Sequence, residues 1–190
     1  MVKTIVTSSF LGVGLAMDAA AVSMANGMNK PCMKVKKVLL IAAMFGLFQG
    51  AMPFIGYLLG SVILSKIEWI IPWIALILLS FIGGKMLLDG INNKEEDCEA
   101  KEELTFKVLL IQAIATSIDA LSVGFTISNY KLIEALVAVL LIAIVTFIIS
   151  FIAVYLGKKF GTRLGNKAVI LGGLILIAIG LEIFISGLII

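Results

Sequence analysis

The chain has 190 residues, of which 61% are hydrophobic and 14% are charged, and its mean hydropathy is +1.16. Soluble globular domains are about 45–50% apolar and about 25% charged. This composition therefore excludes a soluble globular domain and indicates an integral membrane protein. The formal net charge is +3, and the sequence holds no cluster of basic residues suited to binding nucleic acid. It contains no His, which excludes a His-ligated metal site.

Six apolar segments are long enough to cross a bilayer, which takes about 20 helical residues. Short polar stretches separate most of them, and the run NNKEEDCEAKEE is the longest polar stretch. The sequence therefore predicts an all-α integral membrane protein with six transmembrane helices. In chain order these are expected at 4–27, 36–62, 69–91, 106–128, 131–157 and 168–189.

The two halves of the chain resemble each other. GLAMDAAAVS aligns with ATSIDALSVG and places Asp18 on Asp119, and later in the halves Gly83 falls on Gly180. Each half holds three spans, so the second half must be inserted upside down relative to the first. Such inverted repeats are typical of secondary transporters, whose sites lie near the membrane midplane. We expect a first three-helix repeat at 1–91, a cytoplasmic acidic loop at 92–105 and a second, inverted repeat at 106–190.

Lys and Arg gather on one side of the predicted membrane. Eleven of them lie in or beside the connections that follow the first, third and fifth spans, whereas three lie on the other side. The side richer in Lys and Arg is expected to be cytoplasmic. Both termini are then expected outside the cell.

Two carboxylates, those of Asp18 and Asp119, lie near the centres of their spans, where a charge costs at least about 2.5–3.5 kcal/mol. Small residues on the same helical faces allow these faces to pack together about a pseudo-two-fold axis. The carboxylates would then share one midplane site, with hydroxyl oxygens from Thr116, Ser117 and Ser122 nearby. This set suits a hard or borderline divalent cation. The structural alternative is that each Asp is protonated or hydrogen-bonded as part of the helix packing.

The expected site has a consequence for protons. Without metal, two neighbouring carboxylates repel each other and favour proton uptake, and metal binding would expel that proton. The sequence therefore suggests coupled exchange of metal for protons. Glu182, expected in the outer half of the last span, is a candidate proton relay or vestibule group.

Amides and hydroxyls also occur within the spans. Gln49, a further candidate ligand, lies mid-span before Pro53, in a region that can kink and expose carbonyls. Thr146 and Ser150 occupy the corresponding part of the fifth span and are expected to bond to their own helix. Asn26 lies about two turns toward the cytoplasm from Asp18 and about 80° away around the helix, which makes it a weaker candidate ligand.

Four segments resemble the small bacterial manganese efflux pumps, the MntP family: GLAMDAAAVSMANG, FGLFQGAMPFIGYLLG, FIGGKMLLDG and IATSIDALSVG. The resemblance runs nearly end to end. It implies a six-helix inner-membrane exporter of cytoplasmic Mn²⁺, in which Mn²⁺ is cargo and no cofactor is needed. The family's intramembrane acids map onto Asp18 and Asp119, and some members carry Glu where this chain has Gln49. Its other motif positions map onto Ser23, Asn26, Gly27, Thr116, Ser117 and Ser122.

Other functions fit parts of the pattern. The same fold could export another divalent cation or a small solute. An intramembrane aspartyl protease also needs two Asp residues on separate membrane helices, but neither Asp here lies in the GxGD context that resembles those proteases. A non-transporting membrane scaffold is a further alternative. We expect a transporter rather than an enzyme, with the lipid bilayer, Mn²⁺ and H⁺ as its partners.

Overall fold

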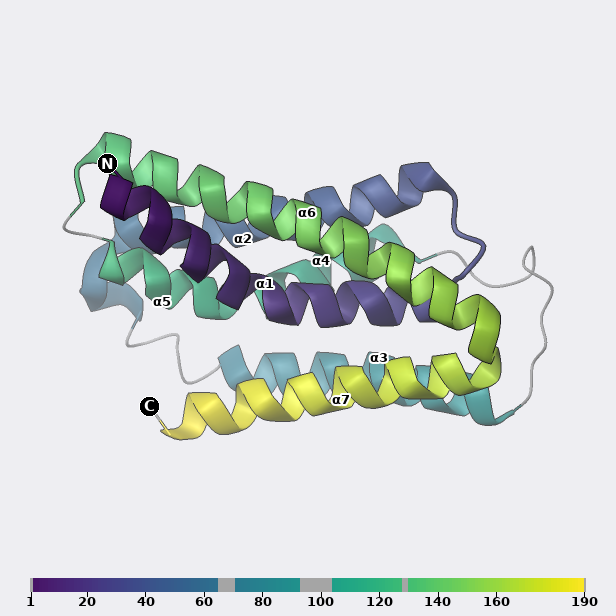
Figure 1. The fold of residues 1–190 in the computed structure, drawn as a ribbon. Helices are drawn as coiled ribbons and strands as arrows, with labels where there is room; N and C mark the ends of the chain where they lie inside the picture. The colour runs from purple at the N-terminus through teal and green to yellow at the C-terminus, as the bar shows by residue number, and fades with distance from the viewer. Residues whose placement is uncertain (1, 65–70, 93–103, 128–129, 190) are drawn as a thin grey trace.

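The structure is a computed structural model that describes residues 2–64, 71–92, 104–127 and 130–189. Within these ranges every regular element is a helix, which confirms the predicted all-α class. The acidic run at 93–103 lies outside the described residues. The helices are α1 Val2–Asn29, α2 Val35–Leu64, α3 Ile71–Ile91, α4 Phe106–Thr116, α5 Ile118–Thr126, α6 Leu132–Leu164 and α7 Asn166–Ile189 (Figure 1).

Several helices are long and apolar enough to cross a membrane. Four qualify alone within the described residues, and α4 with α5 makes a fifth if the bent pair is taken as one span. Many large apolar side chains on the outer surface are exposed, as lipid-facing side chains would be, among them Phe10, Phe81 and Ile133. The chain is thus consistent with a multi-pass membrane protein, while six spans stay a prediction. The four are Ser8–Asn29, Val35–Leu58, Leu132–Leu164 and Asn166–Ile185.

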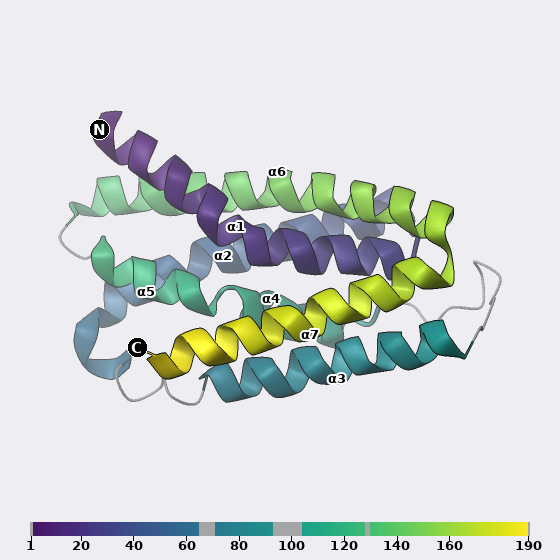
Figure 2. The same cartoon turned by 60° about the horizontal axis from the view of Figure 1, so that its bottom comes forward.

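The expected fourth span is divided into two helices at Ser117. The hydroxyl of Ser117 donates to the carbonyl of Ala113 at 2.7 Å, and its backbone N–H bonds to Ile114 O, three residues back. Such side-chain bonds compete with the helical ladder and bend helices. The helix axis turns by 43° between α4 and α5. Asp119 therefore lies in the first turn of a new helix, and both views show α1 bending near its middle as well (Figures 1 and 2).

Close helix packing depends on glycine at several crossings. A Cβ added at Gly157 of α6 would meet the backbone of Met24 in α1, and one added at Gly124 of α5 would meet the carbonyl of Pro53 in α2. Small residues let backbones approach in this way within membranes. Helix α6 therefore packs along α1, and α5 packs along α2.

Helices α3 and α7 form an antiparallel pair along one side of the bundle (Figure 2). A Cβ at Gly83 would lie 2.6 Å from the carbonyl of Gly173, and one at Gly180 would lie 3.2 Å from Leu79 Cβ. The largest core cluster joins this pair to α1, α2, α4 and α6 through residues such as Met86 and Leu176. The two smaller clusters, which include Ala120 of α5, hold no described residue of α3 or α7.

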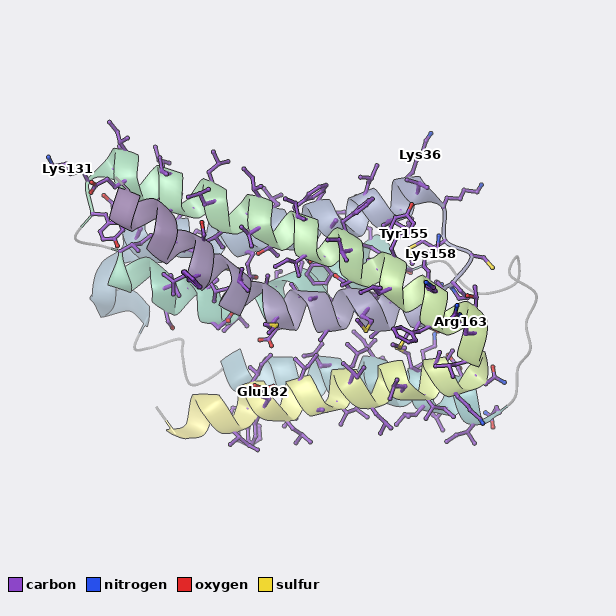
Figure 3. The ribbon with its side chains drawn as sticks, viewed as in Figure 1. Lys36, Lys131, Tyr155, Lys158, Arg163 and Glu182 are labelled. Carbon is purple, nitrogen blue, oxygen red and sulfur yellow. The ribbon has the colours of Figure 1, made fainter. Side chains whose placement is uncertain are left out.

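The two ends of the bundle differ in charge. Helix α1 begins and α7 ends at the same end, where Lys131 lies, while Lys36, Lys158 and Arg163 lie at the opposite end (Figures 1 and 3). There the Lys158 ammonium donates to Met33 O at 2.6 Å and lies 5.6 Å from the centre of a Tyr ring. This separation agrees with the predicted grouping of Lys and Arg on one side.

Candidate functional site

Two acidic side chains, those of Asp119 and Glu182, lie near Asp18 in the bundle. Asp18 projects from α1, Asp119 from the first turn of α5 and Glu182 from α7. Asp18 lies close enough to each of the other two for their negative charges to repel. Figure 3 labels Glu182 on the α7 ribbon. The structure thus brings together the two Asp residues that the sequence singled out, and it adds Glu182 to them.

The helix break at Ser117 positions Asp119. One oxygen of its carboxylate accepts a hydrogen bond of 2.8 Å from the N–H of Ala120. The first turn of a helix has unpaired N–H groups and favours a negative charge. Asp119 and Ser122, one turn later on the same face, are exposed, and Asp18 is half-buried. Asp119 and Ser122 therefore lie at the surface of the bundle, and Asp18 lies partly below it.

The acidic residues do not form a closed metal cage in this arrangement. Among the described residues, no group of three or more Asp, Glu, Cys or His side chains is placed to hold a metal ion. A bound cation would need further oxygens or a closer approach of the helices. Ser122 is the hydroxyl best placed to contribute, because it shares the face of Asp119.

The other predicted hydroxyls lie differently. Thr116 donates to Gln112 O at 3.0 Å, and Ser117 donates to Ala113 O, so both are bonded within their own helix. These two residues shape the break before Asp119. Ser23 is buried and lies about 140° around α1 from Asp18, at ~100° per residue. A Cβ added at Gly27, one turn further along the same face of α1, would meet the carbonyl of Val154 in α6, so Ser23 faces α6 and the structure does not bring it to the acidic group.

A buried amide pair links α1, which carries Asp18, to α4, the helix that precedes Asp119. Asn26 Nδ2 donates to Gln112 Oε1 at 2.8 Å, and Gln112 Nε2 donates back to Asn26 Oδ1 at 3.3 Å. Sequence reasoning missed Gln112. A signal for it existed, because Gln112 precedes Asp119 by about two turns and Asn26 follows Asp18 by about two turns. On antiparallel helices this places both amides on the same side of the acidic group.

We expect Gln112→Leu to lower the free energy of unfolding by about 1–3 kcal/mol, because it leaves the amide of Asn26 buried and unpaired. Denaturation of the purified protein in detergent, followed by circular dichroism, measures this. The double variant Asn26→Leu with Gln112→Leu should recover part of the loss, since no orphaned amide remains. Equal stability of the single variant and the unmodified chain would show that the pair contributes nothing.

Gln49 extends from α2 to the backbone of α1. Its Nε2 donates to Leu15 O at 2.8 Å, while its Oε1 has no hydrogen-bond partner among the described residues. Pro53 has no N–H, so it cannot donate to the Gln49 carbonyl four residues earlier in the helix. Gln49 is thus hydrogen-bonded to the turn of α1 that precedes Asp18. Its side chain is buried and neutral.

Comparison with known proteins identifies related chains. Residues 32–184 match the model of a family described as "Mntp: Putative manganese efflux pump". A protein of Ruminiclostridium cellulolyticum named "Putative manganese efflux pump MntP" is 47% identical over 93% of this chain and 93% of its own length. A protein of the same name from Methanospirillum hungatei is 42% identical over 97% of this chain and 95% of its own. No solved structure matches.

Proposed function

The chain belongs to the family of manganese efflux pumps, and from this premise we propose that it exports Mn²⁺ from the cytoplasm across the inner membrane. Membership makes the chain a transporter and not an enzyme, which excludes the intramembrane protease considered above. Its apolar helices make it a multi-pass membrane protein. Mn²⁺ is the transported substrate.

The proposed substrate site is the acidic pair of Asp18 and Asp119, with Ser122 as an added oxygen and Glu182 at its approach. One observation carries this proposal: Asp119 of α5 and Glu182 of α7, both far from Asp18 in the sequence, each lie within electrostatic range of Asp18. Carboxylate and hydroxyl oxygens are ligands suited to Mn²⁺. A divalent cation placed between the carboxylates would also offset their mutual repulsion.

We propose that the two halves are inverted repeats of one three-helix unit. The sequence alignment at an offset of 97 relates Gly83 to Gly180 and Leu76 to Gly173. The contact of Gly83 with Gly173 then has a counterpart in the contact of Gly180 with Leu76, and both occur between α3 and α7. A two-fold relation between the halves accounts for this reciprocity. The bend of α1 and the break before α5 fit the same relation.

Alternating access is the proposed mechanism. The large core cluster and the Asn26–Gln112 pair join the helices at the Lys-rich end, which is the proposed cytoplasmic end. Toward the other end, α5 shares no core cluster with α3 or α7 among the described residues, and Asp119 is exposed. This arrangement fits a state open to the outside and closed to the cytoplasm. Export requires the amide pair to separate so that cytoplasmic Mn²⁺ reaches the carboxylates.

Proton exchange gives a prediction about pH. A protonated carboxylate cannot act as a metal ligand, so Mn²⁺ binding should release protons and should weaken as the pH falls. Adding Mn²⁺ to the purified protein in weakly buffered detergent solution should acidify the medium, as an indicator dye would show. The double variant Asp18→Asn with Asp119→Asn should release no protons. Release of equal size from that variant would assign the protons to other groups.

Transport in proteoliposomes tests the function itself. Vesicles containing the purified chain should accumulate Mn²⁺ when it is supplied on the cytoplasmic face of the protein, and empty vesicles should not. A panel of Mg²⁺, Ca²⁺, Fe²⁺ and Zn²⁺ distinguishes an exporter of another cation. An imposed pH gradient should change the rate if protons are exchanged. Absence of transport for every cation would favour a non-transporting scaffold.

A further inference from the structure

Glycine contacts join four of the helices into one unit. A Cβ added at Gly157 of α6 would meet the backbone of α1, and one added at Gly46 of α2 would lie 2.9 Å from the carbonyl oxygen of Ala143 in α6. A Cβ added at Gly56 of α2 would meet the carbonyl of Leu121 in α5. Backbone atoms cannot turn aside as a side chain does, so these crossings resist sliding. Helices α1, α2, α5 and α6 therefore form one closely packed unit, which we call the four-helix unit.

Two hydroxyls of α6 lie inside the four-helix unit. Thr146 and Ser150 are buried, between Ala143, which packs against α2, and Val154, which packs against α1. Their oxygens have no hydrogen-bond partner among the described residues, so the expectation that they bond to their own helix is wrong. Both are small side chains of the kind that lets membrane helices lie close together.

Helices α3 and α7 are joined to each other in the same way (Figure 2). A Cβ added at Gly83 or at Gly173 would lie 2.6 Å from the carbonyl oxygen of the other glycine. Toward the end where α3 begins and α7 ends, Trp73 packs edge-on against Phe184, with ring centres 4.6 Å apart. The α3–α7 pair is therefore a second closely packed unit.

The boundary between the two units is packed less tightly. Gly172 of α7 faces α1, and a Cβ added there would lie 3.4 Å from Cα and from the carbonyl oxygen of Ala25, which is an ordinary van der Waals distance. The core cluster at this boundary consists of apolar side chains such as Val22, Met86 and Leu176, and α4 contacts helices of both units. Packed helices can slide on such side-chain contacts by small amounts, and Met adapts its shape readily.

A single glycine joins the four-helix unit to the α3–α7 pair between α6 and α7. Helix α6 ends at Leu164, α7 begins at Asn166, and Gly165 between them has a φ of 52°. Gly165 is exposed, and among the described residues a Cβ added there would meet nothing within 4 Å apart from its chain neighbours. Hinges are a few residues at the ends of elements that absorb changes in φ and ψ. Gly165 is therefore suited to be a hinge between the units.

The boundary also divides the acidic residues. Asp18 and Asp119 belong to the four-helix unit, and Glu182 belongs to the pair. Asp18 lies two turns from Ala25 on the same face of α1, which is the face that meets Gly172 of α7. Since α1 and α7 run in opposite directions (Figure 1), Asp18 lies about 10 Å and Glu182 about 15 Å from that contact toward the same end, at ~1.5 Å per residue. The exposed Glu182 is therefore about one helical turn from the level of Asp18.

We propose that the α3–α7 pair moves as one body against the four-helix unit, about Gly165, and carries Glu182 to Mn²⁺ held by Asp18 and Asp119, where it becomes a third carboxylate ligand. The inference rests on the proposed export and adds a ligand and a moving part to it. The described acidic residues do not form a closed cage in the present arrangement, and this movement would complete one. The bond between Mn²⁺ and Glu182 supplies the differential affinity that a ligand-driven movement needs.

A disulfide across the boundary tests the movement. The chain carries Cys32→Ser and Cys98→Ser, together with Ala25→Cys and Gly172→Cys, whose positions are within disulfide reach. With the disulfide formed, the units cannot move apart at this level, so we expect Mn²⁺ transport in proteoliposomes to fall at least tenfold. Reduction of the same sample should restore the rate.

A disulfide within the pair is the matched control. A Cβ added at Gly180 of α7 would lie 3.5 Å from Leu76 Cα in α3, which is nearly the distance found across the boundary. In the same background, Leu76→Cys with Gly180→Cys should leave transport unchanged when the disulfide forms. Helices that move together tolerate a bond between them.

The Mn²⁺ affinity of the full chain in detergent, measured by calorimetry, tests Glu182 as a ligand. Glu182→Gln keeps the size of the side chain and should lower the affinity about tenfold or more. The disulfide across the boundary should lower it as well, and Glu182→Gln should then have no further effect, because the linked pair cannot bring residue 182 to the cation. Asp89→Asn, which removes an exposed carboxylate of the same pair, should leave the affinity unchanged.

The outcomes separate this inference from the proposed export. Transport at the normal rate with the disulfide across the boundary would overturn the movement and leave export standing. Loss of transport with the disulfide inside the pair would show that α3 and α7 do not move as one body. Equal Mn²⁺ affinity of Glu182→Gln and the unmodified chain would overturn the role of Glu182. If the unmodified chain transports no cation, export fails, and the affinities still decide whether Glu182 is a ligand.

Discussion

Asp18→Asn and Asp119→Asn are each expected to lower Mn²⁺ transport in proteoliposomes by about 100-fold or more. Asn keeps the size of the side chain and removes the negative charge that attracts the cation. Loss of a group that merely supports a metal ligand lowers metal affinity by about 10–100-fold, so loss of a charged ligand should cost at least as much. The loss should appear in the initial rate of ⁵⁴Mn²⁺ uptake and in the resistance of cells to excess manganese.

Asp89→Asn is the control for these two variants. Asp89 is exposed near the end of α3, and its replacement should leave transport unchanged. Gel filtration and circular dichroism must show that all three variants fold. Transport at the normal rate in Asp18→Asn would contradict the proposed site, while membership of the efflux family would be unaffected.

Gly157→Ala is expected to destabilise the protein by about 3 kcal/mol or more, which is at or above the upper part of the usual range for overpacking. The added Cβ would lie 2.9 Å from the Met24 carbonyl carbon and 3.0 Å from Met24 Cα, and it would also meet the Met24 oxygen. These are backbone atoms, so no side-chain rotation relieves the contact. Helices α1 and α6 would have to separate. Thermal unfolding in detergent measures the effect.

Gly84→Ala is the matched control for this effect. Among the residues that the structure describes, a Cβ at Gly84 would meet nothing within 4 Å apart from its own helix and chain neighbours. Ala is favoured over Gly inside helices by about 1 kcal/mol, so this variant should be as stable as the unmodified chain or slightly more so. Equal stability of the two Ala variants would show that α1 and α6 tolerate a wider separation than the structure has.

The sequence predicted the features that depend on composition and on local pattern. Long apolar segments require helices in a membrane, because every backbone polar group must be bonded within its own segment. A charged side chain is costly in the bilayer, so Asp18 and Asp119 were identified as candidate functional residues. The similar sequences around them showed that they occupy equivalent positions in the two halves. The grouping of Lys and Arg agrees with the charge of the two ends of the bundle. None of these inferences needs knowledge of which helix faces which.

The direction of each side chain could not be predicted, because it depends on which helices are neighbours. Ser23 follows Asp18 by five residues and Ser122 follows Asp119 by three, yet Ser23 faces α6 and Ser122 shares the exposed face of Asp119. The partner of Asn26 is Gln112, 86 residues away, and no local pattern identifies such a pair.

The sequence by itself determined the class of the protein, the two intramembrane carboxylates and, through its resemblance, the family. Only the tertiary structure brought Glu182 within electrostatic range of Asp18 and broke the helix before Asp119. It also left four buried oxygens on α1, α2 and α6 without hydrogen-bond partners among the described residues. The physical reason for this division is that the hydrophobicity of a segment and the cost of a charge within it are properties of that segment alone. Electrostatic proximity and hydrogen-bond satisfaction depend on side chains of several helices, and therefore on how closely glycine lets those helices pack.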